Sequence, residues 1–286
     1  MTESPSKDHK GENFPVASRL IAARHRPLVM AFYGFARTAD DIADRPGAAA
    51  ADRLARLEAM RATLSDEADS EPSALALRKA LAARAMPPTH GLDLLEAFRR
   101  DCTKSRYADW AELVDYCRHS AMPVGRFMLD VHGESRALYP ASDALCAALQ
   151  VINHLQDARK DFAAMDRVYV PANALAAAGL DVAALAQASP ALAGVICGLL
   201  PRVDALLAEA AAFADGIVDH GLAFEVAVIH RLATDLVARL RADPFGPRLH
   251  HGKLAALLIA AAAMGALAAR RFGIKGKRAI AGGGRS

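Results

Sequence analysis

The sequence lacks most of the patterns by which common enzyme classes are recognised. It contains no Gly-rich phosphate loop and no G-x-G-x-x-G, so nothing in it indicates a nucleotide or a nicotinamide cofactor. None of its ten histidines pairs with Cys or Glu at metal-ligand spacing. The four cysteines show no C-x-x-C spacing either, and we expect reduced residues that lie mostly in the core: Cys102, Cys117, Cys146 and Cys197.

The sequence also has no large net charge of either sign. The net charge of +3 is too small to indicate a nucleic-acid partner. The first residues, MTESPSKDHKGEN, are polar and contain no apolar core of a secretory signal, so we expect a cytoplasmic protein.

Alternating β-branched runs are almost absent, whereas Ala- and Leu-rich segments with a 3.6-residue period are long. This pattern predicts an all-α fold. We expect a disordered lead at residues 1–12, one domain at 13–272, and a loose basic and Gly-rich tail at 273–286. The predicted helices span residues 15–23, 26–44, 50–65, 73–84, 90–102, 109–119, 121–132, 142–163, 172–176, 181–186, 189–219, 222–241 and 251–270.

One of these helices carries a polar stripe in an apolar setting. Four residues recur at spacings of three, four and four and therefore share one helix face: Gln150, Asn153, Asp157 and Asp161. Two carboxylates and two amides on a buried helix are costly without partners, and the two aspartates repel each other. A bound cation relieves both costs.

A second stripe lies upstream, in the segment YGFARTADDIAD. Its members recur at spacings of four, three and four, with Asp41 beside them: Tyr33, Arg37, Asp40 and Asp44. Facing one another, two Asp-x-x-x-Asp helices would form an oxygen-rich cage suited to Mg²⁺, and Arg37 would suit a phosphate. The alternative is that both are solvated helix faces with scattered acids, which the occurrence of two such stripes disfavours.

Two further segments are candidates for a site. YCRHSAMPVGR, from Tyr116 to Arg126, holds a proline and a glycine close together, which predicts a break between helices. Its small residues, Ser120 and Gly125 among them, let a ligand or another helix approach the backbone. RVYVP, residues 167–171, is predicted to be a loop that brings the cation of Arg167 and the phenol of Tyr169 back toward the pocket between the two stripes.

The C-terminal segment raises the question of a membrane. Residues 254–269 carry no charge, but sixteen residues fall short of the roughly 20 that span a bilayer. We expect a buried helix followed by a basic tail. The alternative is a peripheral contact with anionic lipid at the inner face of the membrane.

Taken together, these segments resemble the squalene/phytoene synthase family. The resemblance covers most of the chain, from ENFPVAS through RTADDIAD, YCRHSAMPVGR, QVINHLQDARKD and RVYVP. It implies a single bundle of α-helices around a central cavity. Within the family, ENFPVAS and SAMPVGR look like the hydroxysqualene synthase branch of the hopanoid pathway. The family commonly has an arginine where this chain has Gln156, a change that alters how a diphosphate is held.

The resemblance also implies roles for individual residues. Metal ions would be held by Asp40, Asp41, Asp44, Asn153, Asp157 and Asp161, and the acidic pairs would be catalytic together with Tyr116. A prenyl diphosphate would be contacted by Tyr33, Arg37, Ser120, Gly125, Gln150, Asn153, Arg167 and Tyr169.

The reaction implied by the resemblance is the magnesium-dependent conversion of presqualene diphosphate and water to hydroxysqualene and diphosphate. Such an enzyme would be linked to a presqualene diphosphate synthase and to a squalene-forming reductase. Two alternatives stay open. One is head-to-head condensation of two farnesyl or geranylgeranyl diphosphates, and the other is a non-catalytic assembly protein, against which the intact aspartates argue.

Overall fold

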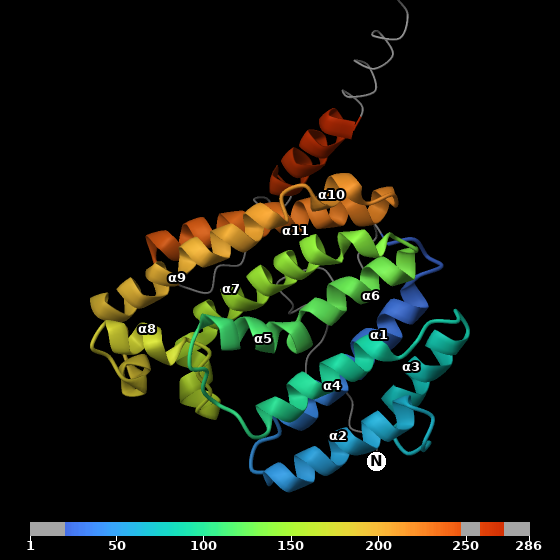
Figure 1. Cartoon of the computed structure of the whole chain (residues 1–286), viewed down its shortest axis with the longest axis horizontal. Coiled ribbons are helices and arrows are strands. Elements are labelled where there is room, and N and C mark those ends of the chain that lie inside the picture. Colours follow the sequence, from blue (N-terminus) through green and yellow to red (C-terminus); the bar gives the residue numbers. More distant parts are fainter. Residues whose placement is uncertain (1–20, 247–257, 272–286) are drawn as a thin grey trace, which may run out of the picture.

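The structure is a computed structural model that describes residues 21–246 and 258–271, and these form a bundle of α-helices (Figure 1). The only β-type pairing in these ranges is an isolated bridge between Arg106 and Val168. A helical segment at residues 258–271 follows the named elements. In chain order these are α1 (Arg26–Ala43), α2 (Ala50–Leu64), α3 (Pro72–Ala82), α4 (Thr89–Asp101), α5 (Trp110–Ser120), α6 (Met122–His132), η2 (Arg136–Leu138), α7 (Tyr139–Met165), α8 (Ala172–Ala177), η3 (Val182–Ala186), α9 (Pro190–Glu209), α10 (Phe213–Gly216) and α11 (His220–Ala242).

Local sequence signals fix several helix ends. Asp109, Ser189 and Asp219 each accept a hydrogen bond from the backbone N–H three residues on, at 2.9, 3.1 and 2.9 Å. Such side chains satisfy donors that the first turn of a helix leaves open, so they begin α5, α9 and α11. Gly133, with φ of 71°, ends α6 in the left-handed conformation that favours glycine.

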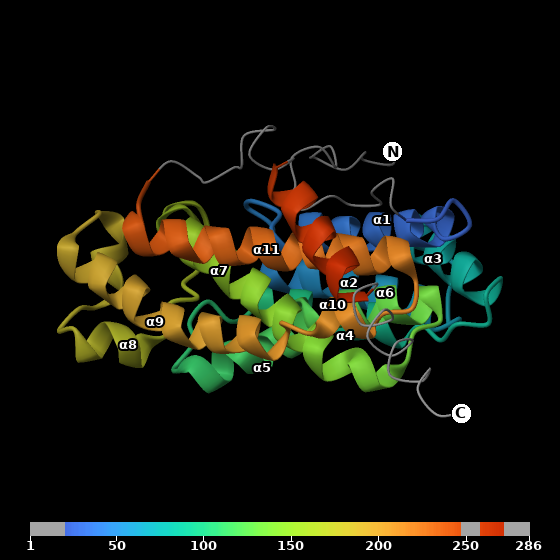
Figure 2. The same cartoon turned by 90° about the horizontal axis from the view of Figure 1, so that it is seen from above.

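Buried side chains form two hydrophobic clusters. One lies among α1–α4, and the other surrounds α7. Helix α6 joins them, because its Phe127 stacks on Phe32 of α1 with ring centroids 3.8 Å apart. Helix α7, with 27 residues, contacts α5, α6, α9 and α11 (Figure 2). Polar residues along α7 are therefore held on a rigid, mostly buried element.

Helices α6 and α7 pack closely at Gly125. A Cβ added there would lie 2.6 Å from Sγ of Cys146 and closer still to Oγ of Ser142. We expect Gly125→Ala to lower the free energy of unfolding by about 2 kcal/mol, because two side chains on a packed helix would have to move. Urea denaturation measures this. Gly194→Ala on α9 is the matched control, since no atom lies within 4 Å of the added Cβ; equal stability of both variants would contradict the prediction.

The predicted all-α fold is confirmed, and most predicted helices are present with shifted ends. The single helix predicted over 189–219 is wrong, because the chain turns between α9 and α10. Ala210 and Phe213 are buried on either side of this turn. Packing therefore interrupts an Ala-rich segment that has no local stop signal. The helix predicted at 15–23 lies mostly outside the described residues, and residues 21–23 are not helical.

The burial predicted for the C-terminal helix is also wrong. In its described part, residues 258–271, Leu267 is buried, whereas Leu258 is 63% exposed. Alanine offers little apolar area, and the contact with the bundle is partly polar: Arg270 pairs with Asp215 at 3.1 Å. Among the described residues, only the stretch Pro190–Gly216, which comprises α9, the turn and α10, is long and apolar enough to cross a membrane by length and composition.

The cysteines divide into two pairs by burial. Cys102 and Cys117 are buried as predicted, while Cys146 and Cys197 are half-buried. All four are free thiols. The predicted lead at 1–12 and tail at 273–286 lie outside the described residues, so the domain limits stay a prediction.

Candidate active site

The first acidic stripe lies along one half-buried face of α1. Its residues alternate with buried Phe32, Phe35 and Ala39, so the stripe borders the core without entering it. Arg37 donates to the carboxylates of Asp40 and Asp41 at 2.6 and 2.8 Å. The guanidinium predicted to hold a phosphate is thus paired with acids of its own stripe. Its role toward a phosphate stays a prediction.

The second stripe has the same character on α7. All four of its members are half-buried, and they alternate with buried Val151, Ile152 and Ala158. Burial, together with the neighbouring carboxylate of Asp157, raises the pKa of Asp161 to about 6. The folded protein therefore holds two acids close together at a cost that a cation would remove.

Arg167, in the loop after α7, contacts both stripes. Its backbone N–H donates to the carbonyl of Asp161 at 3.3 Å, and its Nη1 lies 2.9 Å from a carboxylate oxygen of Asp44 at the end of α1. Its Nη2 donates to the backbone carbonyl of Asp101 at 3.3 Å. The charge of Asp44 also adds to the raised pKa of Asp161, so the two carboxylates are within electrostatic reach. The predicted return of the 167–171 loop toward the stripes is observed.

The aspartates do not collapse into one cluster. Among the described residues, no three of them bring ligand oxygens within 4.8 Å of one another. A single ion held by both stripes is therefore not preformed.

Asp101, at the end of α4, is a site residue that the sequence analysis missed. Its carboxylate accepts hydrogen bonds from the hydroxyls of Tyr116 and Tyr169, at 2.8 and 3.3 Å. Burial raises its pKa to about 6, against the lowering effect of Arg167 and Tyr116. A signal existed in the sequence: Asp101 lies four residues after Ala97 on the apolar face of its helix, where an acid needs partners.

Aromatic rings form a wall beside this carboxylate. The rings of Tyr107, Tyr116 and Tyr169 lie with centroids 5.3 to 5.4 Å apart, and His154 stacks on Tyr169 at 3.5 Å. Burial lowers the pKa of His154 to about 3 and raises the pKa of each tyrosine, so all four rings are neutral at pH 7. Neutral rings with negative faces suit a nearby carbocation.

An open pocket of about 620 Å³ adjoins Asp44, Asp101 and Arg167. Its rim carries further cations, Arg53 and Lys104. The pocket adjoins the end of the first stripe and the end of α7, and it gives a polar group access to Asp44 and Arg167 from solvent.

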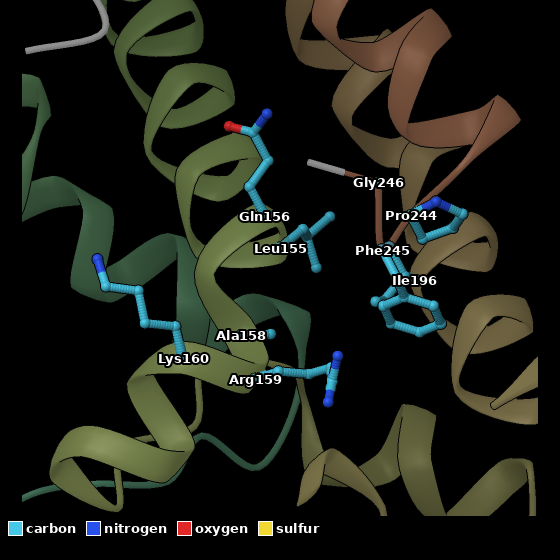
Figure 3. Close-up of a pocket in the computed structure, with 9 residues that line it drawn as sticks. All are labelled: Leu155, Gln156, Ala158, Arg159, Lys160, Ile196, Pro244, Phe245 and Gly246. Carbon is cyan, nitrogen blue, oxygen red and sulfur yellow. The ribbon is translucent and has the colours of Figure 1, made fainter. Parts of the chain in front are cut away.

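A smaller pocket of about 350 Å³ lies on another side of α7 (Figure 3). Figure 3 shows Arg159 and Phe245 directed toward one another across it, and Lys160 extending to the opposite side of the helix. Gln156, at the position where the resemblance leads one to expect arginine, has a buried side-chain oxygen without a hydrogen-bond partner in the described part of the chain.

The remaining predicted residues are dispersed. Gln150 bonds to Nε2 of His154 at 3.1 Å, and so connects its stripe to the aromatic wall. Ser120 is half-buried at the end of α5, and Gly125 lies in the α6–α7 contact. The structure gives Gly125 a packing role, and its predicted contact with substrate stays a prediction.

The raised pKa of Asp161 leads to a test in metal-free protein. We expect Asp161→Asn to raise the free energy of unfolding by about 1 kcal/mol at pH 7 and to have no such effect below pH 4. Because the pKa of Asp161 is about 6 in the folded protein, above that of an unfolded aspartate, protonation of Asp161 stabilises the fold. This stabilisation is fully present in acid and is lost as the pH rises through 6, and an asparagine does not lose it. The difference between this pKa and that of an ordinary aspartate corresponds to at most roughly 3 kcal/mol, and partial exposure of the side chain reduces it.

Urea unfolding with a chelator at both pH values measures this difference. Asp166→Asn is the control, because the side chain of Asp166 is 72% exposed and should give no gain that grows with pH. An Asp161→Asn variant that is no more stable than the wild type at pH 7 would contradict the assigned electrostatic cost.

The chain is similar to known proteins along most of its length. The sequence profile of squalene/phytoene synthases matches residues 7–256. The chain is 51% identical to the hydroxysqualene synthase of Zymomonas mobilis over 259 residues, 89% of this chain and 87% of that protein. It is 48% identical to the hydroxysqualene synthase of Rhodopseudomonas palustris over 273 residues, 94% of each. Its fold matches squalene synthase HpnC from Alicyclobacillus acidocaldarius with a TM-score of 0.71 and 32% identity, over 81% of this chain and 89% of that one.

Proposed function

The chain belongs to the squalene/phytoene synthase family and is an enzyme of this kind, and we propose that it converts presqualene diphosphate and water to hydroxysqualene and diphosphate with the aid of Mg²⁺. The observation that carries the proposal is the pair of half-buried acidic stripes connected by Arg167. The names of the relatives at 48–51% identity support the choice of reaction.

Magnesium fits the donor set of the two stripes. Enzymes of this family use prenyl diphosphates and generally need a divalent metal. The available ligands are carboxylate and amide oxygens, which Mg²⁺ prefers. Burial and the neighbouring charge of Asp157 raise the pKa of Asp161, and a bound cation would offset both effects. When bound, the ions would neutralise charge on the departing diphosphate. The residues that would hold them are Asp40, Asp41, Asp44, Asn153, Asp157 and Asp161.

The other residues act on the two ends of the substrate. The bond between carbon and the diphosphate oxygen breaks, and its electron pair stays on the diphosphate. Arg37 and Arg167 supply two further positive charges for the departing diphosphate. The hydrocarbon is left as a carbocation, which neutral aromatic rings stabilise without forming a bond. Asp101 is a positioning residue, because it fixes the hydroxyls of Tyr116 and Tyr169.

Water then supplies the new hydroxyl group. Its oxygen forms a bond to the carbocation and one proton is released, so no reductant is consumed. Gln156 supports this partial reaction, since a neutral amide in place of a cation changes the hold on the diphosphate. We also propose that the enzyme is cytoplasmic and contacts the inner face of the membrane, because its substrate and product carry long hydrocarbon chains. A presqualene diphosphate synthase would supply the substrate and a squalene-forming reductase would use the product.

A product assay tests the proposal. Purified protein with magnesium and without NADPH is offered presqualene diphosphate and farnesyl diphosphate separately. We expect hydroxysqualene from the first and no consumption of the second. Consumption of farnesyl diphosphate would replace the proposal by a condensing synthase, in keeping with the name squalene synthase that the solved relative carries. Inactivity on both substrates would overturn it.

A further inference from the structure

Three ligand-type side chains from separate elements meet at one end of the bundle. His25 directly precedes α1, His132 is the last residue of α6, and Asp219 caps α11. One nitrogen of each imidazole and one carboxylate oxygen all lie within 4.8 Å of one another. The acidic stripe of α1 is at the other end of that helix: nineteen residues separate His25 from Asp44, about 28 Å at the rise of an α-helix. This group is therefore separate from the active site.

The hydrogen bond of His132 identifies the ring nitrogen that donates. Its Nδ1 lies 2.8 Å from the backbone carbonyl of Met128, which can only accept, so Nδ1 carries the hydrogen. The lone pair is consequently on Nε2, which is buried and has no hydrogen-bond partner in the described part of the chain. A backbone carbonyl on one ring nitrogen is the usual arrangement that orients the other nitrogen toward a metal.

His25 presents a second buried ring nitrogen. The residue is 3% exposed, and its Nε2 is also buried without a partner among the described residues. Its ring centroid lies 4.4 Å from that of His132.

The surrounding charges are balanced. Nη2 of Arg84 can only donate, so its 3.4 Å contact with Nδ1 of His25 makes Nδ1 the acceptor. Metal binding through Nε2 requires the other tautomer, and Nη2 then keeps the carbonyl of Val131, at 3.2 Å, as its partner. Arg24 lies 4.0 Å from Asp219, on a side chain that is 71% exposed and able to move away. The buried carboxylate of Glu134, bonded to the backbone N–H groups of Val218 and Asp219, adds a second negative charge nearby.

We propose that His25, His132 and Asp219 form a binding site for Zn²⁺ that fastens α1, α6 and α11 together. Two imidazoles and one carboxylate suit zinc, whereas Mg²⁺ prefers oxygen ligands alone. Three protein ligands leave a fourth position for water. An ion bound only by the folded chain stabilises it, so zinc should raise the melting temperature.

The experiment uses the full chain without an affinity tag, with millimolar Mg²⁺ present to occupy the acidic stripes. Zinc is titrated by calorimetry and thermal unfolding is followed. We expect one equivalent of Zn²⁺ to bind, and His132→Ala to weaken that binding about 100-fold or more. His230→Ala is the matched control, because its imidazole also bonds to a backbone carbonyl, that of Leu207 at 2.8 Å.

Two further measurements make the result decisive. Arg24→Ala should tighten zinc binding several-fold, since it removes a cation from Asp219 on an exposed side chain. A crystal soaked in zinc should show an anomalous scattering peak between His25 and His132. Equal zinc binding by the His132→Ala and His230→Ala variants, no effect of Arg24→Ala, or a peak only elsewhere would overturn the proposal. None of these readouts depends on the reaction proposed for the acidic stripes.

Discussion

Replacing Asp157 by asparagine is expected to lower turnover about 1000-fold while leaving the fold intact. An amide keeps the shape of the side chain but loses the charge that would hold a metal beside the departing diphosphate, and removal of one such electrostatic contribution costs roughly 100- to 1000-fold. Asp40→Asn on the opposite stripe should behave alike. Single-turnover formation of product from presqualene diphosphate measures the effect, and circular dichroism reports the helical content.

Asp204→Asn on α9 is the control for charge removal. Asp204 pairs with Arg241 on an exposed surface, so its loss should leave turnover unchanged. Near-normal turnover in both stripe variants would refute the metal-holding role of the aspartates. Loss of helical content would point instead to a structural role.

Arg167→Gln is expected to lower turnover about 100-fold and the free energy of unfolding by about 2 kcal/mol. The Arg167 side chain is only 9% exposed, and its removal leaves the carboxylate of Asp44 and the carbonyl of Asp101 without their partner. Breaking a buried pair from one side is strongly destabilising, and the partial exposure of Asp44 moderates the loss. Urea denaturation and the product assay measure the two effects.

Arg106→Gln separates this role from that of a surface cation. Arg106 also binds the chain at the end of α7, through Asp166, but it is more exposed and should change stability by less than about 1 kcal/mol. If Arg167→Gln loses stability but keeps normal turnover, Arg167 is a structural residue and leaves the set of substrate ligands. If Arg167→Gln matches Arg106→Gln in both assays, the contact of Arg167 with Asp44 contributes neither to stability nor to turnover.

The sequence by itself determined the fold class and the two stripes. Helical periodicity is a local property, so the spacing of Asp40 and Asp44, or of Asp157 and Asp161, fixed their common faces before any packing was known. The break predicted between Tyr116 and Arg126 is found where α5 ends and α6 begins. The sequence resemblance named the family that the comparisons then showed.

Other features depended on the packing of several helices. The bond from Arg167 to Asp44 joins residues 123 positions apart, and the phenols that hold Asp101 come from α5 and from the loop after α7. The turn between α9 and α10 and the exposure of residues 258–271 likewise follow from which surfaces the bundle covers. A helix face follows from 3.6 residues per turn, whereas the partner of that face depends on how all the helices bury their apolar surfaces together.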